Sequence, residues 1–270
     1  MVESLKELNR ICQKPRYKEV GNWMVRNILR DAALPITRLL LHTQVTANQV
    51  TLWSLVIGML GGILLAFKPW GAFLAGAVLM QLWYLLDHVD GQIARYRKTA
   101  CLTGRFFDYV MHHAIHGVLF FSLGVYCFSS TNNFFFVWWG FVTSLSIMMF
   151  NLMHDAKYKT FFEAFAGLKT KAISFSQPQD SPEEKQAEKK SALRKTFSLL
   201  HKLAEIHVLM NILSLAAVIA WITKGTWDLR FLLMIFYGIT VPIIAVAKIS
   251  YWIGRREIDR EFDQTFKRSL

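Results

Sequence analysis

The chain has 270 residues, of which 53% are hydrophobic and 14% aromatic, and its formal net charge is +12. This composition excludes a disordered chain, and several apolar runs approach the roughly 20 residues that a helix needs to cross a bilayer. The basic residues gather in a few segments between those runs, which argues against a nucleic-acid-binding face.

The first 45 residues predict a cytoplasmic segment that contains an amphipathic helix lying in the membrane interface. Between Trp23 and Leu41, apolar residues recur near one helical face while basic residues project elsewhere. Pro35 predicts a kink or a division into two short helices. The pattern leaves open whether this segment only anchors the chain or also contributes to a site.

Residues 46–254 predict an all-α integral membrane domain with six transmembrane helices. The expected spans are Val50–Phe67, Ala72–Leu86, Phe106–Phe128, Phe134–Met153, Val208–Ile222 and Phe231–Ile253. The second and fifth spans are short, so polar residues at their ends are expected to line a cavity enclosed by protein. We predict one domain of six helices preceded by the interfacial helix.

Lys and Arg predict the orientation, because short positively charged loops stay in the cytoplasm. The N-terminal segment, the connections 91–105 and 157–202, and the tail hold 27 of the 31 basic residues. Both termini are therefore predicted to be cytoplasmic. Within residues 156–205, the polar stretch Gln177–Ser191 is typical of a solvated linker, and residues 255–270 form a cytoplasmic tail.

Residues 87–112 carry the residues best suited to chemistry. Carboxylates at the end of an apolar helix require a compensating cation, and Asp87 and Asp90 lie three residues apart there. At helical spacing they share a face with Gly91 and Ala94, which leave room for a ligand to approach the backbone. Mg²⁺ favours such oxygen ligands and commonly bridges carboxylates and phosphates.

The same chemistry extends past the second span. Arg95 is suited to pair with a phosphate, and Gly104 allows close approach at the start of the third span. Asp108 and His112 follow Gly104 at intervals of four residues and therefore share its face. The sequence thus predicts that acidic residues from two spans meet at the cytoplasmic membrane surface.

This spacing resembles the class I CDP-alcohol phosphotransferase family, whose signature is D-x2-D-G-x2-A-R-x8-G-x3-D-x3-D. Seven of its eight positions match at Asp87, Asp90, Gly91, Ala94, Arg95, Gly104 and Asp108, and the eighth is His112 in place of aspartate. The stretch Thr46–Thr51 also resembles the family's TPNxxT element, with Ala47 in place of proline.

The resemblance implies a metal-dependent transfer of a substituted phosphate from a CDP-linked alcohol to an acceptor hydroxyl, with release of CMP, in phospholipid or related phosphodiester synthesis. One or two ions of Mg²⁺ or Mn²⁺ would be held by Asp87, Asp90, Asp108 and His112. The CDP group would contact Asp90, Gly91, Ala94, Arg95 and Gly104. The family resemblance also implies a homodimer in contact with membrane lipid.

His112 departs from the signature at the position where the family carries an aspartate thought to act as base and metal ligand. A neutral imidazole can accept a proton from a positioned hydroxyl, so we hypothesise that His112 and Asp108 are catalytic and that His112 is the general base. The alternatives are that His112 only binds metal, or that the site has lost activity and the chain is a CDP-binding pseudoenzyme.

Other polar residues near the same membrane face carry weaker signals. His116 continues the face of His112 one turn deeper, whereas His113 points away. Acceptor recognition or helix capping is expected for a further set: Asn151, His154, Asp155, Glu205, His207 and Asn211. Lys248, inside the sixth span, is expected to reach a phosphate or to extend toward the cytoplasm.

Two donors are compatible with the motif. The long segment before the first span favours a CDP-linked polar alcohol, with a lipid or a polyol phosphate as acceptor. The alternative is CDP-diacylglycerol with a small polar alcohol as acceptor. A transporter is the alternative from another class, but a pore would not require glycine and alanine at the observed spacing.

Overall fold

The computed structural model describes residues 2–13, 17–19, 21–167, 199–200 and 202–266. Within these ranges the chain forms helices and no strand, which confirms the all-α prediction. The predicted linker stretch Gln177–Ser191 lies outside the described residues.

Five of the described helices are long and apolar enough to cross a membrane. These are α3 (Ala47–Leu64), α4 (Trp70–Tyr96), α5 (Leu102–Thr131), α6 (Phe135–Gly167) and α9 (Arg230–Arg255). Helix α8 (Ile206–Ile222) is apolar but has only 17 residues, so the count of six spans stays a prediction. Helix α6 continues as far as Gly167, past the expected end of the fourth span at Met153.

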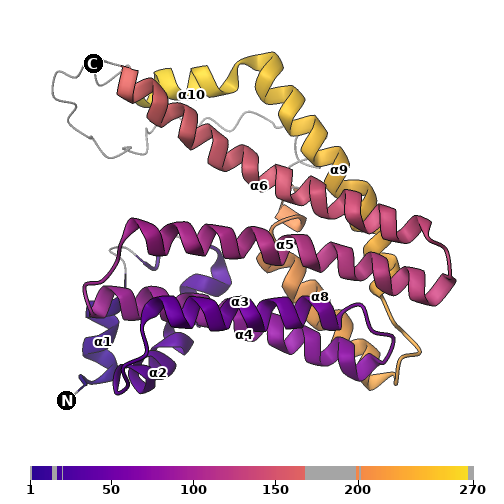
Figure 1. The fold of residues 1–270 in the computed structure, drawn as a ribbon, viewed down its shortest axis with the longest axis horizontal. Coiled ribbons are helices and arrows are strands. Elements are labelled where there is room, and N and C mark those ends of the chain that lie inside the picture. The colour runs from indigo at the N-terminus through magenta and orange to yellow at the C-terminus, as the bar shows by residue number, and fades with distance from the viewer. Residues whose placement is uncertain (1, 14–16, 20, 168–198, 201, 267–270) are drawn as a thin grey trace.

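Among the described residues, three short helical elements precede the first long helix, and one follows the last. They are α1 (Leu5–Cys12), the π-helical turn η1 (Val25–Leu29), α2 (Arg30–Leu41) and α10 (Glu257–Phe266). Pro35 lies inside α2, and the irregular π-helical segment ends at Leu29, just before α2 begins. Figure 1 shows α1, α2 and α10 at the same end of the bundle.

The apolar side chains of the amphipathic segment before the first span are partly buried in the protein and partly exposed on its surface. Val25, Leu29 and Ala33 are buried, and α2 packs against α4. Ile28 and Leu39 remain exposed, as expected for side chains that face lipid at an interface. The segment is therefore joined to the helical domain as well as being suited to a membrane surface.

Glycines set the closest helix contacts. Helix α3 packs against α4 and α5, while α6 packs against α5 and α9 (Figure 1). A Cβ atom added at Gly76 of α4 would lie 2.8 Å from the main-chain oxygen of Gly61 in α3. A Cβ atom at Gly124 of α5 would lie 2.5 Å from the main-chain oxygen of Phe136. Neither position has room for a side chain, which is typical of helices that pack closely in membranes.

At the opposite end of the bundle, Arg230 joins α9 to the turn after α3. Its fully buried guanidinium donates hydrogen bonds to the main-chain oxygens of Leu65, Phe67 and Lys68. Its Nε atom also donates to Asp228 at 3.0 Å. Burial acts to raise the pKa of Asp228, but hydrogen bonds and the charge of Arg230 hold it below the ordinary value. The buried guanidinium thus has hydrogen-bond acceptors from both segments, and it holds the turn after α3 against the start of α9. This junction lies at the end of the bundle that is remote from the motif.

Candidate active site

The helix α3 begins at a capping box that positions the first part of the site. The Thr46 hydroxyl accepts from the main-chain N–H of Gln49, and the Gln49 side chain accepts from the main-chain N–H of Thr46. One turn later, the Thr51 hydroxyl lies 2.6 Å from a carboxylate oxygen of Asp90 and donates to it. The element that resembles TPNxxT therefore starts α3 and connects it to the motif helix α4.

The turn between α4 and α5 is held from outside the motif. Arg97 donates to the main-chain oxygens of Thr43 and Val45, at 2.7 and 2.6 Å. Lys98 adopts a positive φ of 55°, which ends α4 and reverses the chain. Cys101 then caps α5, since its sulfur accepts from the main-chain N–H of Gly104 at 3.4 Å. These contacts reverse the chain so that α5, which packs against α3, turns its half of the motif toward the half on α4.

Asp87, Asp108 and His112 meet at this junction. One ligand atom from each residue lies within 4.8 Å of the other two. The His112 Nε2 atom is 3.0 Å from Asp87 Oδ1 and 3.3 Å from Asp108 Oδ1. Two carboxylates and an imidazole at this separation are suited to hold a divalent cation, and carboxylate oxygens favour Mg²⁺ or Mn²⁺.

The contacts of His112 place a proton on one ring nitrogen. Ionised carboxylates only accept hydrogen bonds, so a ring nitrogen that contacts two of them carries a proton. In the cation-free arrangement this nitrogen is Nε2, which both carboxylates approach. The ring also packs edge-on against Trp83, with centroids 5.4 Å apart.

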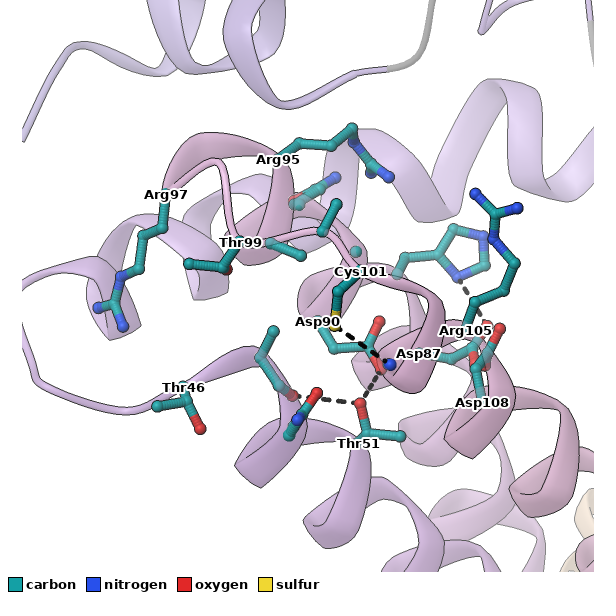
Figure 2. A pocket seen from close by; sticks show the side chains of 18 of the residues that line it. Thr46, Thr51, Asp87, Asp90, Arg95, Arg97, Thr99, Cys101, Arg105 and Asp108 are labelled. Atoms are coloured by element: carbon teal, nitrogen blue, oxygen red, sulfur yellow. Dashed lines mark hydrogen bonds and ion pairs between the residues drawn. The ribbon is translucent and has the colours of Figure 1, made fainter.

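Asp90 occupies a different place from the other two acidic residues. It is largely buried, it hydrogen-bonds to Thr51, and it lies outside the three-residue group that could hold a metal ion. Figure 2 shows Asp90 close to Asp87 and Asp108, with arginine side chains farther out. A metal-binding role for Asp90 stays a prediction.

All seven residues that match the family signature line one cavity of about 880 Å³. A volume of this size is typical of small-molecule sites. His112 is absent from the lining of this cavity but contacts two aspartates that belong to it. The structure thus brings all eight predicted site residues into one region formed by α4 and α5.

Gly91 and Arg95 form one wall of the cavity. A Cβ atom at Gly91 would lie 3.1 Å from the Arg95 Nη1 atom, so the guanidinium extends across the glycine. At the other wall, a Cβ atom at Gly104 would lie 3.4 Å from the Asn48 side-chain oxygen. The two glycines therefore leave space where a ligand can approach both helices.

Sequence reasoning missed several residues that line the cavity. Gln13, Arg30 and Gln92 come from α4 and the N-terminal segment, while Arg97 and Arg105 flank the turn. Arg30 was expected only to project from the amphipathic helix. Gln13 and Arg30 lie far before the motif in the sequence, whereas Gln92, Arg97 and Arg105 stand at positions that the signature leaves open to any residue. Neither case gave a signal that these side chains would line the cavity.

The weaker candidates form pairs outside the Asp87, Asp108 and His112 group. Their contacts are His116 with Asn151, His113 with Asp155, His154 with Lys248, and Glu205 with His207. Asn211 instead accepts a hydrogen bond from Gln81 at 3.1 Å. Since His113 contacts α6, it does point away from the Asp108 and His112 face. Acceptor recognition by any of these residues stays a prediction.

Comparison with known proteins identifies the family. The CDP-alcohol phosphatidyltransferase family model matches residues 44–177, which contain the whole motif. The chain belongs to this family, as the resemblance in its motif indicated. Together with the five long apolar helices, this makes it a multi-pass membrane protein.

Two relatives extend this assignment. The bifunctional IPC transferase and DIPP synthase of Aquifex aeolicus is 27% identical over 110 residues, which cover 40% of this chain and 24% of the relative. The match therefore spans about a quarter of that relative. The phosphatidylinositol phosphate synthase of Mycobacterium tuberculosis, solved with CDP-DAG bound, has a TM-score of 0.51 and 18% identity. That alignment covers 86% of this chain and 92% of the other and shows a shared fold.

Proposed function

We propose that this protein transfers a substituted phosphate group from a CDP-linked alcohol to an acceptor hydroxyl and releases CMP. One observation carries the proposal: the seven signature residues line a single cavity, beside an Asp87, Asp108 and His112 group suited to a divalent cation. The family assignment supports the same reaction class.

The residues have distinct roles in this proposal. Asp87 and Asp108 would hold one or two ions of Mg²⁺ or Mn²⁺, with Asp90 at the edge of the group and His112 as the base or as a further ligand. When bound, such ions neutralise charge on the diphosphate and its leaving group. Arg95 contacts a phosphate of the donor, and the small residues Gly91, Ala94 and Gly104 admit the CDP group to the backbone. Thr51 fixes the carboxylate of Asp90 through its 2.6 Å hydrogen bond.

The acceptor oxygen attacks the phosphorus that carries the donor alcohol, and the bond from that phosphorus to the bridging oxygen breaks. CMP leaves with that oxygen, while the proton of the acceptor hydroxyl passes to a base. We assign the base to His112, which lies 3.0 Å from Asp87 and 3.3 Å from Asp108 and therefore beside the cation that they would hold. The competing role is that His112 Nε2 binds metal, and the two roles respond differently to metal concentration.

The donor that we favour is a CDP-linked polar alcohol, with a lipid or polyol phosphate as acceptor. The lining of the cavity includes the polar side chains of Gln13, Arg30 and Arg95 besides the aspartates, which suits a donor that is polar at both ends. CDP-diacylglycerol is the second candidate, because the structurally similar synthase was solved with CDP-DAG bound. We also propose cytoplasmic termini, a cytoplasmic site and a homodimer, on the basis of loop charge and family resemblance.

Release of CMP tests the reaction and the donor together. Purified protein would be incubated with Mg²⁺ or Mn²⁺, one donor of each class, and a panel of lipid, polyol phosphate and small alcohol acceptors. We expect acceptor-dependent CMP release with one donor class and its loss in Asp87→Asn. Nucleotide binding without CMP release across the whole panel would contradict the proposal and indicate a CDP-binding pseudoenzyme.

A further inference from the structure

The N-terminal helix α1 is docked on the motif end of α4. Its Leu8 and Cys12 side chains are fully buried and share an apolar cluster with Leu34 of α2 and Tyr96 of α4. A capping box at Ser4 defines the start of the helix. Since an isolated helix of eight residues is unstable in water, packing against α2 and α4 must hold it in place.

The last residue of α1 contacts the motif arginine directly. The Arg95 Nε atom donates a hydrogen bond to the main-chain oxygen of Cys12. The final carbonyl groups of a helix lack partners within it and carry the negative end of its dipole, so a guanidinium is a suitable partner. The same guanidinium extends across Gly91 toward the cavity.

Further contacts keep α1 in register with α4. The Tyr96 hydroxyl donates to Glu3 at 2.6 Å, and the Gln13 side chain donates to the main-chain oxygen of Arg30 at 3.3 Å. Gln92 of α4 donates to that same oxygen at 2.8 Å. Three of these residues, Gln13, Arg30 and Gln92, also line the cavity. The contacts of α1 are thus with the motif and its surroundings, as well as with the amphipathic segment.

The N–H groups of Arg95 have two different surroundings: one binds α1, and the others face the cavity beside Gly91. A guanidinium carries five N–H groups in a planar fork, and the Cys12 carbonyl takes the one on Nε. The remaining N–H groups, on Nη1 and Nη2, lie beside Gly91, where a ligand can approach. Fixing a long side chain before the ligand arrives reduces the entropy lost on binding, which is worth about 3- to 10-fold in affinity.

We propose that α1 is a positioning element of the donor site: its C-terminal carbonyl aims the Arg95 guanidinium at the diphosphate of the CDP group. Residues 2–13 then set the affinity of the chain for the nucleotide. This inference rests on the proposed function, because it takes a CDP-linked donor as the ligand of the cavity.

Matched substitutions in α1 test the proposal. Leu8→Asp places a charge at a fully buried position and separates α1 from α4, whereas Ile11→Asp makes the same chemical change at a site that is 45% exposed. CDP with Mg²⁺ is the binding probe, measured by calorimetry, and CMP release gives KM and kcat for the donor. We expect Leu8→Asp to raise the Kd for CDP and the KM by about 3- to 10-fold with kcat within about 2-fold. Ile11→Asp should match the wild type.

A double-substitution cycle separates positioning of Arg95 from a general loss of structure. In an Arg95→Ala background, Leu8→Asp should cause no further loss of CDP affinity, because the side chain that α1 positions is gone. Equal losses from Leu8→Asp in both backgrounds would overturn the proposal, as would an unchanged Kd in Leu8→Asp. If Leu8→Asp does not fold, Leu8→Ala should show a smaller rise in Kd, and no rise there would also overturn it.

The outcomes separate this inference from the proposed function. Wild-type protein that binds CDP without releasing CMP would contradict the transferase reaction, while the effect of Leu8→Asp on CDP affinity would still test the role of α1. Wild-type protein that releases CMP and shows equal affinities for CDP in Leu8→Asp and Ile11→Asp would contradict the role of α1 alone. Failure of the wild type to bind CDP would overturn both.

Discussion

His112, which stands where the family signature carries aspartate, gives the sharpest test of the proposed chemistry. His112→Ala removes both the proposed base and the imidazole that links Asp87 with Asp108. Loss of a general base typically lowers the rate by about 10²- to 10⁴-fold. We therefore expect kcat for CMP release to fall by that factor at saturating Mg²⁺.

The same substitution has a second effect that can be worked from the geometry. The candidate ligand atoms of Asp87 and Asp108 lie within 4.8 Å of each other. At that distance and an effective dielectric constant of about 20, two negative charges repel by about 3.5 kcal/mol. Without the imidazole, this repulsion destabilises the cation-free protein, so Mg²⁺ should raise the unfolding temperature of His112→Ala strongly.

Metal titration separates the two roles of His112. If the residue is the base, excess Mg²⁺ leaves the loss of kcat unchanged. If it serves only as a ligand, excess Mg²⁺ restores turnover, as long as Asp87 and Asp108 still bind the ion. His112→Asp returns the family residue and should recover part of the rate. Near-normal turnover in His112→Ala with intact metal binding would refute the assignment of His112 as base.

Three further substitutions test the geometry around the site. Thr51→Val removes the 2.6 Å hydrogen bond to Asp90 and should lower kcat/KM for CMP release by about 10- to 100-fold, whereas Thr51→Ser should retain most activity. Gly124→Val places atoms 2.5 Å from a main-chain oxygen of α6 and should lower the unfolding temperature in detergent; Gly71→Val, with nothing within 4 Å, is the control. Arg230→Met removes the buried guanidinium that binds the partly buried Asp228 and three main-chain oxygens, and should reduce the free energy of unfolding by about 3–5 kcal/mol, while Arg230→Lys should lose less. An unfolding temperature of Arg230→Met equal to that of the wild type would contradict this account of the remote loops.

The residues that sequence reasoning located best share a local pattern. Asp87, Asp90 and Gly91 lie on one helical turn, and helical spacing alone predicts their common face. The return of the chain from α4 to α5 also follows from sequence, because only five residues separate the helices and short connections keep consecutive helices near each other. That α3 packs against both helices and so completes the junction does not follow from this spacing.

The residues that sequence reasoning missed depend on packing between distant segments. Arg97 contacts main-chain oxygens more than fifty residues earlier, at Thr43 and Val45. The contact from Arg95 to Cys12 spans 83 residues and uses a main-chain atom, which has no side-chain identity to recognise. Helix α8 shows a different limit: its 17 residues are short for a span, so hydropathy does not fix the number of spans.

The contact between Gly61 and Gly76 has a consequence for the chemistry at the other end of α4. Gly76 lies fourteen residues before Asp90, about 21 Å along the helix. A side chain at this crossing would push α3 away from α4. Because both helices are rigid, the shift would also lengthen the hydrogen bond between Thr51 and Asp90. Inactivating substitutions should therefore also arise at this helix crossing, far from the nucleotide site, in proteins that still insert and fold.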